Sequence, residues 1–142
     1  MADECAIRDS SHGKALAGVR VLVCEDDADA RDLLLNLLMA EGANVRVAAS
    51  VPETMAHLPD FRPDVLVSDI GLPIVDGYAL IEQVRALSPG EGGLTPAIAL
   101  TAYARREDAR KAVLSGYQLH MIKPVEPSEL VVNVAKLADR AN

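Results

Sequence analysis

The sequence predicts an α/β domain with a doubly wound parallel sheet. Five short apolar runs alternate along the chain with five segments of helical pattern. The apolar runs consist almost entirely of Val, Ile, Leu and Ala, which is typical of strands that helices cover on both faces. Strand–helix–strand units of this kind pack into one sheet through right-handed crossovers. A chain of 142 residues, half of them apolar, can form one such core.

The elements follow from their periodicity and their end signals. The expected strands are residues 19–24, 43–48, 64–68, 96–101 and 118–122, and the expected helices are 28–41, 105–115, 127–140 and two that start at 52 and 77. The first helix has an apolar stripe that includes Leu34 and Leu38, and Gly42 follows its end. Pro127 suits the first turn of the last helix. The Asp76-Gly77 pair is interpreted as the turn into the third helix, with glycine chosen for its backbone freedom.

The ends of the chain and one internal stretch lack apolar periodicity. Residues 1–17 mix Asp, Ser, His, Gly and Lys, so we expect a flexible tail or linker there and a folded domain over residues 18–142. Residues 88–93, SPGEGG, are expected to form a mobile loop. The sequence shows neither an internal repeat nor a low-complexity segment.

Composition limits which kinds of partner and which cellular location are expected. The formal charge is −7, from 14 basic and 21 acidic residues, which argues against nucleic-acid binding because phosphate contacts need clustered Lys and Arg. No apolar run approaches the ~20 residues of a membrane span, and the polar N-terminus is unlike a signal peptide. We therefore expect a cytoplasmic domain without membrane contact. Cys5 and Cys24 are too few for a disulfide framework and are expected to be reduced thiols.

Polar residues follow four of the five expected strands. Glu25, Asp26 and Asp27 follow strand 19–24, Asp69 follows strand 64–68, Thr101 ends strand 96–101, and Lys123 follows strand 118–122. Singly, each has a simpler interpretation: the acids after the first strand, Asp29 among them, as helix caps, and the others as turn or solvated loop residues. Together they lie at the carboxyl ends of the strands, where open parallel sheets bind their ligands. Their coincidence predicts a functional site.

Several carboxylates at one point repel each other and need a compensating cation. The residues at this edge offer hard oxygen ligands and neither His nor Cys, which favours Mg²⁺. Lys123 adds a second positive charge and Thr101 a hydroxyl donor. A metal ion, an ammonium and a hydroxyl that converge on Asp69 are what a phosphoryl group on this carboxylate would require.

These residues resemble the receiver domain of two-component response regulators, including the single-domain chemotaxis regulator. The match covers about residues 18 to 139 through the blocks VLVCEDD, LVSDIGLPIVDGYALI, ALTA and HMIKPVEP. The resemblance implies a flavodoxin-like α/β/α sandwich with strand order 2-1-3-4-5. By position, Glu25 and Asp26 correspond to the acidic pair of the family, Asp69 to its phosphoacceptor, Thr101 to its switch hydroxyl and Lys123 to its characteristic lysine.

The resemblance also implies a mechanism. A histidine kinase or phosphotransfer protein presents phosphohistidine, and Asp69 attacks the phosphoryl group in the presence of Mg²⁺, for which Mn²⁺ can substitute. Asp26, Asp69 and the main-chain carbonyl of Gly71 are the expected metal ligands, and Glu25 acts mostly through water. Asp27 lies one place past the acidic pair and is left out. Such a domain is a phosphoacceptor that promotes its own phosphorylation and dephosphorylation, not an enzyme with a separate substrate.

Several positions bear on switching. In the family the bond before Pro124 is usually cis, which directs the lysine into the cleft. His120 stands at the strand position where the family usually has an aromatic switch residue. Gly71 and Tyr103 occupy the two positions that tune dephosphorylation, and neither offers an acid or amide to orient water. We therefore expect slower hydrolysis than in the chemotaxis regulator.

The expected output surface comprises the helix at 105–115, strand 118–122 and the helix at 127–140, with Tyr117, His120 and Val125 near it. A downstream output protein or domain, or a second copy in a homodimer, would bind there. The block HMIKPVEPSEL resembles receivers at the C-terminus of hybrid histidine kinases, and a stand-alone regulator is the other arrangement.

Three other functions compete with this interpretation. An aspartyl-phosphate hydrolase needs a second acid two residues past the nucleophile, where this chain has Gly71. A dinucleotide-binding domain needs a glycine-rich loop after the first strand, where this chain has acids. The alternative that stays open is a phosphorylation-independent protein-interaction domain that kept the fold and lost the switch.

Overall fold

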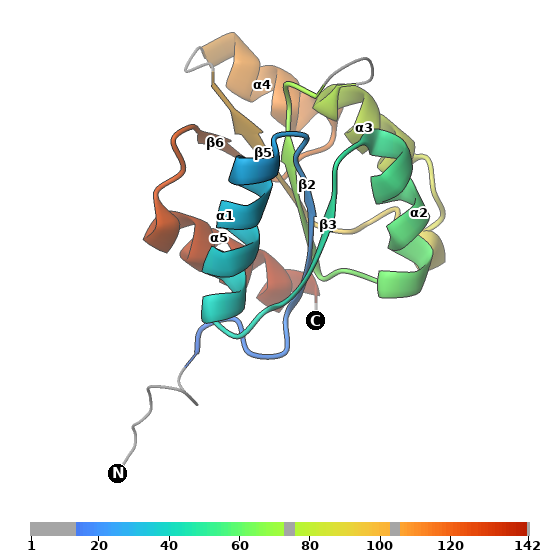
Figure 1. The fold of residues 1–142 in the computed structure, drawn as a ribbon. Helices are drawn as coiled ribbons and strands as arrows, with labels where there is room; N and C mark the ends of the chain where they lie inside the picture. The colour runs from blue at the N-terminus through green and yellow to red at the C-terminus, as the bar shows by residue number, and fades with distance from the viewer. Residues whose placement is uncertain (1–13, 73–75, 103–105, 142) are drawn as a thin grey trace.

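The computed structural model describes residues 14–72, 76–102 and 106–141, except for the side chains of residues 140 and 141. Its centre is a five-stranded parallel sheet in the order β3-β2-β4-β5-β6 (Figure 1). The strands are β2 (Arg20–Cys24), β3 (Asn44–Ala48), β4 (Val65–Asp69), β5 (Ala97–Thr101) and β6 (Leu119–Ile122). Numbered from the first strand of the sheet, this is the predicted order 2-1-3-4-5, so the doubly wound, flavodoxin-like fold is confirmed.

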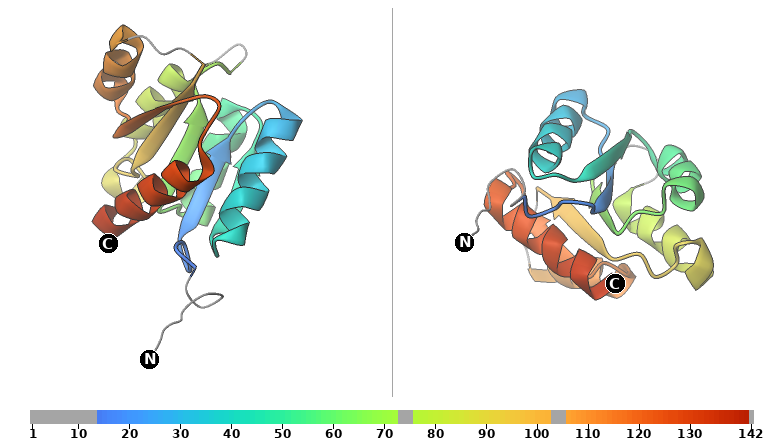
Figure 2. Two further views of the ribbon diagram at one scale, coloured as in Figure 1. Left: turned by 90° about the vertical axis from the view of Figure 1, so that its left-hand side faces the viewer. Right: turned by 90° about the horizontal axis from the view of Figure 1, so that it is seen from below.

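Five helices alternate with the strands and form the two outer layers (Figure 2). They are α1 (Ala28–Ala40), α2 (Val51–Phe61), α3 (Gly77–Arg85), α4 (Arg106–Ser115) and α5 (Pro127–Ala141), with a short 3-10 helix η2 (Pro89–Glu91). Helices α1 and α5 pack on one face of the sheet, and α2, α3 and α4 on the other.

The two faces of each central strand belong to different cores. Val21 and Val23 pack towards α1 and α5, whereas Leu22 and Cys24 pack towards α2 and α3. All five residues of β4 are buried. This double coverage is why the strands show continuous apolar runs instead of alternation.

Short polar side chains fix where three helices begin. The carboxylate of Asp27 accepts the Ala30 N–H at 2.8 Å at the start of α1, and Asp76 accepts the Ala79 N–H at 3.0 Å at the start of α3. Ser50 caps α2 in the same way. These caps satisfy N–H groups that lack a partner in the first helical turn.

Two segments expected to be loop or tail contain ordered contacts. Residues 88–93, expected to be a mobile loop, include η2 at Pro89–Glu91, and the Glu91 carboxylate accepts bonds from the Ser88 N–H and hydroxyl. Leu16, which the sequence pattern assigns to the tail, is fully buried against the first core, and its N–H donates to the Glu41 carbonyl at 2.9 Å. A single apolar residue carries no periodicity, so the pattern could not reveal it.

Candidate phosphoacceptor and metal site

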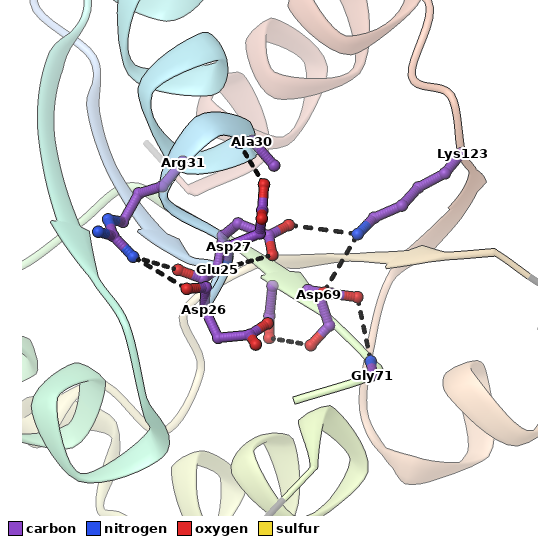
Figure 3. A network of polar contacts seen from close by, with 9 residues as sticks. Glu25, Asp26, Asp27, Ala30, Arg31, Asp69, Gly71 and Lys123 are labelled. Atoms are coloured by element: carbon purple, nitrogen blue, oxygen red, sulfur yellow. Dashed lines mark hydrogen bonds and ion pairs between the residues drawn. The ribbon is translucent and has the colours of Figure 1, made fainter. Parts of the chain in front are cut away.

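The polar residues predicted at the carboxyl ends of the strands meet at one end of the sheet (Figure 3). Glu25, Asp26 and Asp69 each offer a carboxylate oxygen, and these oxygens lie within 4.8 Å of one another. Glu25 is only 1% exposed and Asp69 7%, whereas Asp26 is exposed. Two of the three charges are therefore shielded from water, and their mutual repulsion is strong.

Lys123 bridges the two buried carboxylates. Its Nζ lies 3.1 Å from Asp69 Oδ2 and 3.2 Å from Glu25 Oε1, and Figure 3 shows it reaching across from the end of β6. Burial raises the pKa of the Glu25 carboxyl and the charge of Asp69 adds to the rise, although the Asp27 N–H and Lys123 oppose it. Partial burial lowers the pKa of Lys123, but its bonds to the two carboxylates outweigh this, so the net shift of that pKa is upward. One ammonium thus compensates only part of the negative charge.

The Asp69 carboxylate is held at both oxygens. Its Oδ1 accepts the Gly71 N–H at 3.0 Å, while Oδ2 pairs with Lys123. The residue ends β4 in register with Leu100, and the following Ile70 N–H donates to the Leu100 carbonyl at 2.8 Å. The carboxylate therefore projects from the rigid end of a central strand.

The loop between β2 and α1 is fixed by bonds that sequence reasoning missed. The Asp27 N–H donates to Glu25 Oε2 at 3.1 Å, and the Arg31 guanidinium donates to the main-chain carbonyls of Glu25 and Asp26 at 3.0 and 3.3 Å. Arg31 lies on α1, and the sequence gives no indication that it holds this loop. Its partners are main-chain carbonyls, which are present at every position of the chain.

Thr101 and Pro124 are the neighbours of Lys123 in the structure. Thr101 ends β5, is 2% exposed, and its carbonyl accepts the Lys123 N–H at 2.7 Å. The Lys123-Pro124 peptide bond is cis, as the family resemblance implies. The main chain of Thr101 thus anchors the residue whose ammonium enters the site.

The sequence model of the family described as the response regulator receiver domain matches residues 21–135 of this chain. The chain belongs to this family. This receiver domain is 48% identical over 118 residues to an uncharacterized 14.6 kDa protein from Leptolyngbya boryana, a match covering 83% of this chain and 88% of that protein. It is 30% identical over 139 residues to hybrid signal transduction histidine kinase D of Dictyostelium discoideum, covering 94% of this chain and 9% of the kinase. With the transcriptional regulatory protein PrrA of Mycobacterium leprae it shares 31% identity, covering 85% of this chain and 50% of PrrA.

Solved structures agree. The receiver domain of Francisella response regulator 1452 superposes with a TM-score of 0.81 at 26% identity, covering 88% of this chain and 100% of that one. The receiver domain of sensor histidine kinase PA1611 from Pseudomonas aeruginosa superposes with a TM-score of 0.78 at 27% identity, covering 87% of this chain and 99% of that one. Its structure has a magnesium ion coordinated in the active site cleft. Receivers of the family act with histidine kinases and output domains. This chain spans half or less of the length of PrrA and of the hybrid kinase.

The residues predicted to take part in switching lie in different environments. His120 lies on β6, partly buried, and its Nε2 is buried without a hydrogen-bond partner among the residues that the structure describes. Tyr103 lies outside the described residues. Tyr117, expected near the output surface, follows α4 closely, but its side chain is 2% exposed and belongs to the core with residues of α3.

The described helices include none that is both long enough and apolar enough to cross a membrane.

Proposed function

We propose that this receiver domain accepts a phosphoryl group on Asp69 in a reaction that requires Mg²⁺. The observation that carries the proposal is the contact of Lys123 Nζ with Asp69 and Glu25, at 3.1 and 3.2 Å, beside three carboxylates within 4.8 Å of one another. A lysine and an acidic cluster around one strand-end aspartate suit the binding of a cation and of a phosphoryl group together.

The donor set fits a hard divalent cation. Asp26, Asp69 and the Gly71 carbonyl are the ligands we propose, with Glu25 acting through water, and all of these atoms are oxygens, as Mg²⁺ and Mn²⁺ prefer. When bound, the ion supplies charge neutralisation for the phosphoryl oxygens. The PA1611 receiver, which contains a magnesium ion in its cleft, supports this choice by analogy.

The residues of the chain orient and then hold the phosphoryl group. The Gly71 N–H and Lys123 fix the Asp69 carboxylate, so one of its oxygens can attack the phosphorus of a phosphohistidine. As the new O–P bond forms, the P–N bond of the donor breaks and its electron pair returns to the imidazole. Lys123 and the Thr101 hydroxyl then each bind one phosphoryl oxygen.

The phosphoryl donor would be a histidine kinase or a histidine phosphotransfer protein. The downstream partner would bind the surface formed by α4, β6 and α5. Exposed apolar side chains on this surface support an interaction there: Val113 and Leu114 on α4 are 55% and 79% exposed, and Ile122 on β6 is 46% exposed. A downstream protein or domain, or a second copy of the chain, would cover them. We also propose a cytoplasmic location, as is typical of the family, and a receiver extending over residues 18–142 with Leu16 packed against it.

The experiment is phosphorylation by acetyl phosphate, followed by intact-mass analysis. Wild type should gain one phosphoryl group with Mg²⁺ and none with EDTA, and Asp69→Asn should gain none. Asp27→Asn is the matched control: it removes a neighbouring carboxylate that caps α1 outside the cluster, so it should be phosphorylated like wild type. If folded wild type binds Mg²⁺ but gains no phosphoryl group, the chain is instead a phosphorylation-independent interaction domain.

The lifetime of the phosphorylated protein tests a second expectation. Gly71 offers no acid or amide to orient an attacking water, so hydrolysis should be slow. Decay of the phosphorylated mass after removal of acetyl phosphate measures it, and a half-life of a few seconds would contradict the proposal.

A further inference from the structure

The Tyr117 hydroxyl lies beneath the site and has no part in the chemistry proposed above. The side chain is 2% exposed, and its hydroxyl donates to the main-chain carbonyl of Gly77 at 2.7 Å. Gly77 is the first residue of α3, whereas Tyr117 follows α4 directly and its N–H donates to the Ala112 carbonyl at 3.0 Å. One phenol therefore ties the end of α4 to the start of α3.

Gly77 in turn lies directly against the backbone of the phosphoacceptor. Its N–H donates to the Ile70 carbonyl at 2.9 Å. A Cβ at position 77 would lie 2.7 Å from the Asp69 carbonyl oxygen and 2.8 Å from the Ile70 Cα. With no space between these backbones, a displacement of Gly77 must be accompanied by movement of the Asp69–Ile70 peptide.

The other end of the connection is also rigid. The Arg85 guanidinium donates two bonds, at 3.0 and 2.8 Å, to the carbonyl of Gly116, the residue before Tyr117. Burial strongly raises the pKa of the Tyr117 phenol, so the hydroxyl keeps the proton that it donates at neutral pH. The ring thus spans between two fixed main-chain segments.

We propose that Tyr117 is a positioning residue that holds Asp69 in its reactive orientation through Gly77 and couples the end of α4 to the phosphoacceptor. The inference rests on the proposed function of Asp69. Because such coupling is reciprocal, a shift of α4 on binding a partner would change the reactivity of Asp69, and phosphorylation of Asp69 would bias α4.

Tyr117→Phe tests the inference, because it removes the hydroxyl and keeps the ring that fills the core. In an α-helix each carbonyl accepts the N–H of the residue four positions later, and the Gly77 carbonyl keeps this bond in the variant. The substitution therefore leaves no unpaired acceptor. We expect its rate constant for phosphorylation by acetyl phosphate, at saturating Mg²⁺, to fall about threefold to tenfold, as expected for the loss of one buried hydrogen bond.

Thr54→Val is the matched control. It also removes one buried hydroxyl, which donates to the Ser50 carbonyl at 2.8 Å and contacts the Cys24 thiol, but it does so at α2 and not at α3 or α4. Both variants are compared at a temperature where thermal unfolding shows them to be fully folded. A purely structural role would lower the melting temperatures of both and leave both rate constants unchanged.

A spectroscopic readout separates this inference from the proposed function. The Gly71 N–H donates to Asp69 Oδ1, so its amide resonance reports the orientation of the carboxylate. Tyr117→Phe should shift this resonance and Thr54→Val should not. If wild type is not phosphorylated at all, the proposed function fails and the resonance alone decides the positioning role. If wild type is phosphorylated and Tyr117→Phe reacts within twofold of it, or both variants slow equally, the inference is overturned.

Discussion

Removing the charge of Asp69, the proposed phosphoacceptor, should stabilise the metal-free protein. Asp69→Asn deletes an attraction to Lys123 at 3.1 Å, about 5 kcal/mol at an effective dielectric constant of 20, and relieves repulsion from Glu25 within 4.8 Å, about 3.5 kcal/mol. Asp26 adds further repulsion, reduced because its side chain is exposed. The Coulomb terms therefore almost cancel.

The desolvation of Asp69 then decides the sign. Its carboxylate is 7% exposed, and a neutral amide costs much less to bury while its oxygen can still accept the Gly71 N–H. We expect Asp69→Asn to raise the free energy of unfolding by about 1 to 2 kcal/mol in EDTA, which corresponds to about 4 to 8 °C in melting temperature for a domain of this size. Asp27→Asn, with the same change of charge at a helix cap, should stay within about 0.5 kcal/mol of wild type.

Circular dichroism during heating or urea titration measures these differences. Mg²⁺ at ten times its dissociation constant should stabilise wild type by about 1.4 kcal/mol and the Asp69→Asn variant by less, so the difference in the free energy of unfolding between the two proteins should shrink. Lowering the pH should reduce this difference too. The pKa of Glu25 is raised in the folded state, so below that pKa Glu25 is neutral and Asp69 meets less repulsion. A variant less stable than wild type in EDTA, or a gap unaffected by Mg²⁺, would refute the reasoning.

Three further predictions concern single side chains elsewhere in the domain. Arg31→Ala should weaken Mg²⁺ binding several-fold by calorimetry with little loss of stability, because the guanidinium holds the carbonyls of Glu25 and Asp26; equal affinity would exclude this role. Cys24 is buried with its thiol pKa raised to about 11, so iodoacetamide at pH 8 should label it in urea but not in the native protein, as peptide mass mapping would reveal. Arg85→Met should lower the free energy of unfolding by about 3 kcal/mol in urea titration, because three main-chain carbonyls lose a charged donor; a loss below about 1 kcal/mol would contradict this.

The fold could be predicted because its determinants are local. Strand and helix periodicity needs only neighbouring residues, and right-handed crossovers leave few ways to assemble five strand–helix units. The residues of the candidate site were brought together by one topological rule, since carboxyl ends of parallel strands share an edge. The structure accordingly places carboxylate oxygens of Glu25, Asp26 and Asp69 within 4.8 Å of one another. Lys123 contacts Glu25 and Asp69.

The supporting residues could not be predicted, because their partners are main-chain atoms distant in sequence. Arg85 donates to the carbonyl of Gly116, 31 residues away, and the Tyr117 hydroxyl donates to Gly77, 40 residues away. A carbonyl exists at every position, so nothing in the sequence marks which one a side chain will bind. Tyr117 was therefore placed near the surface by its neighbours, although it is buried.

Glycine illustrates how one residue type conceals two physical requirements. Gly42 ends α1 with φ at 93°, a backbone conformation that L side chains rarely adopt, so its sequence interpretation as a helix stop was physically correct. Gly77 was interpreted as a turn glycine too, yet its φ is not positive, and what it needs is space beside the Asp69 carbonyl, 2.7 Å from where a Cβ would lie. An alanine at 42 would strain its own backbone and press on Lys14 and Ala17, 3.1 to 3.2 Å from its Cβ, whereas one at 77 would press on the backbone of Asp69, the proposed phosphoacceptor. Substitution at 77 should therefore impair phosphorylation beyond its effect on stability, and substitution at 42 should not.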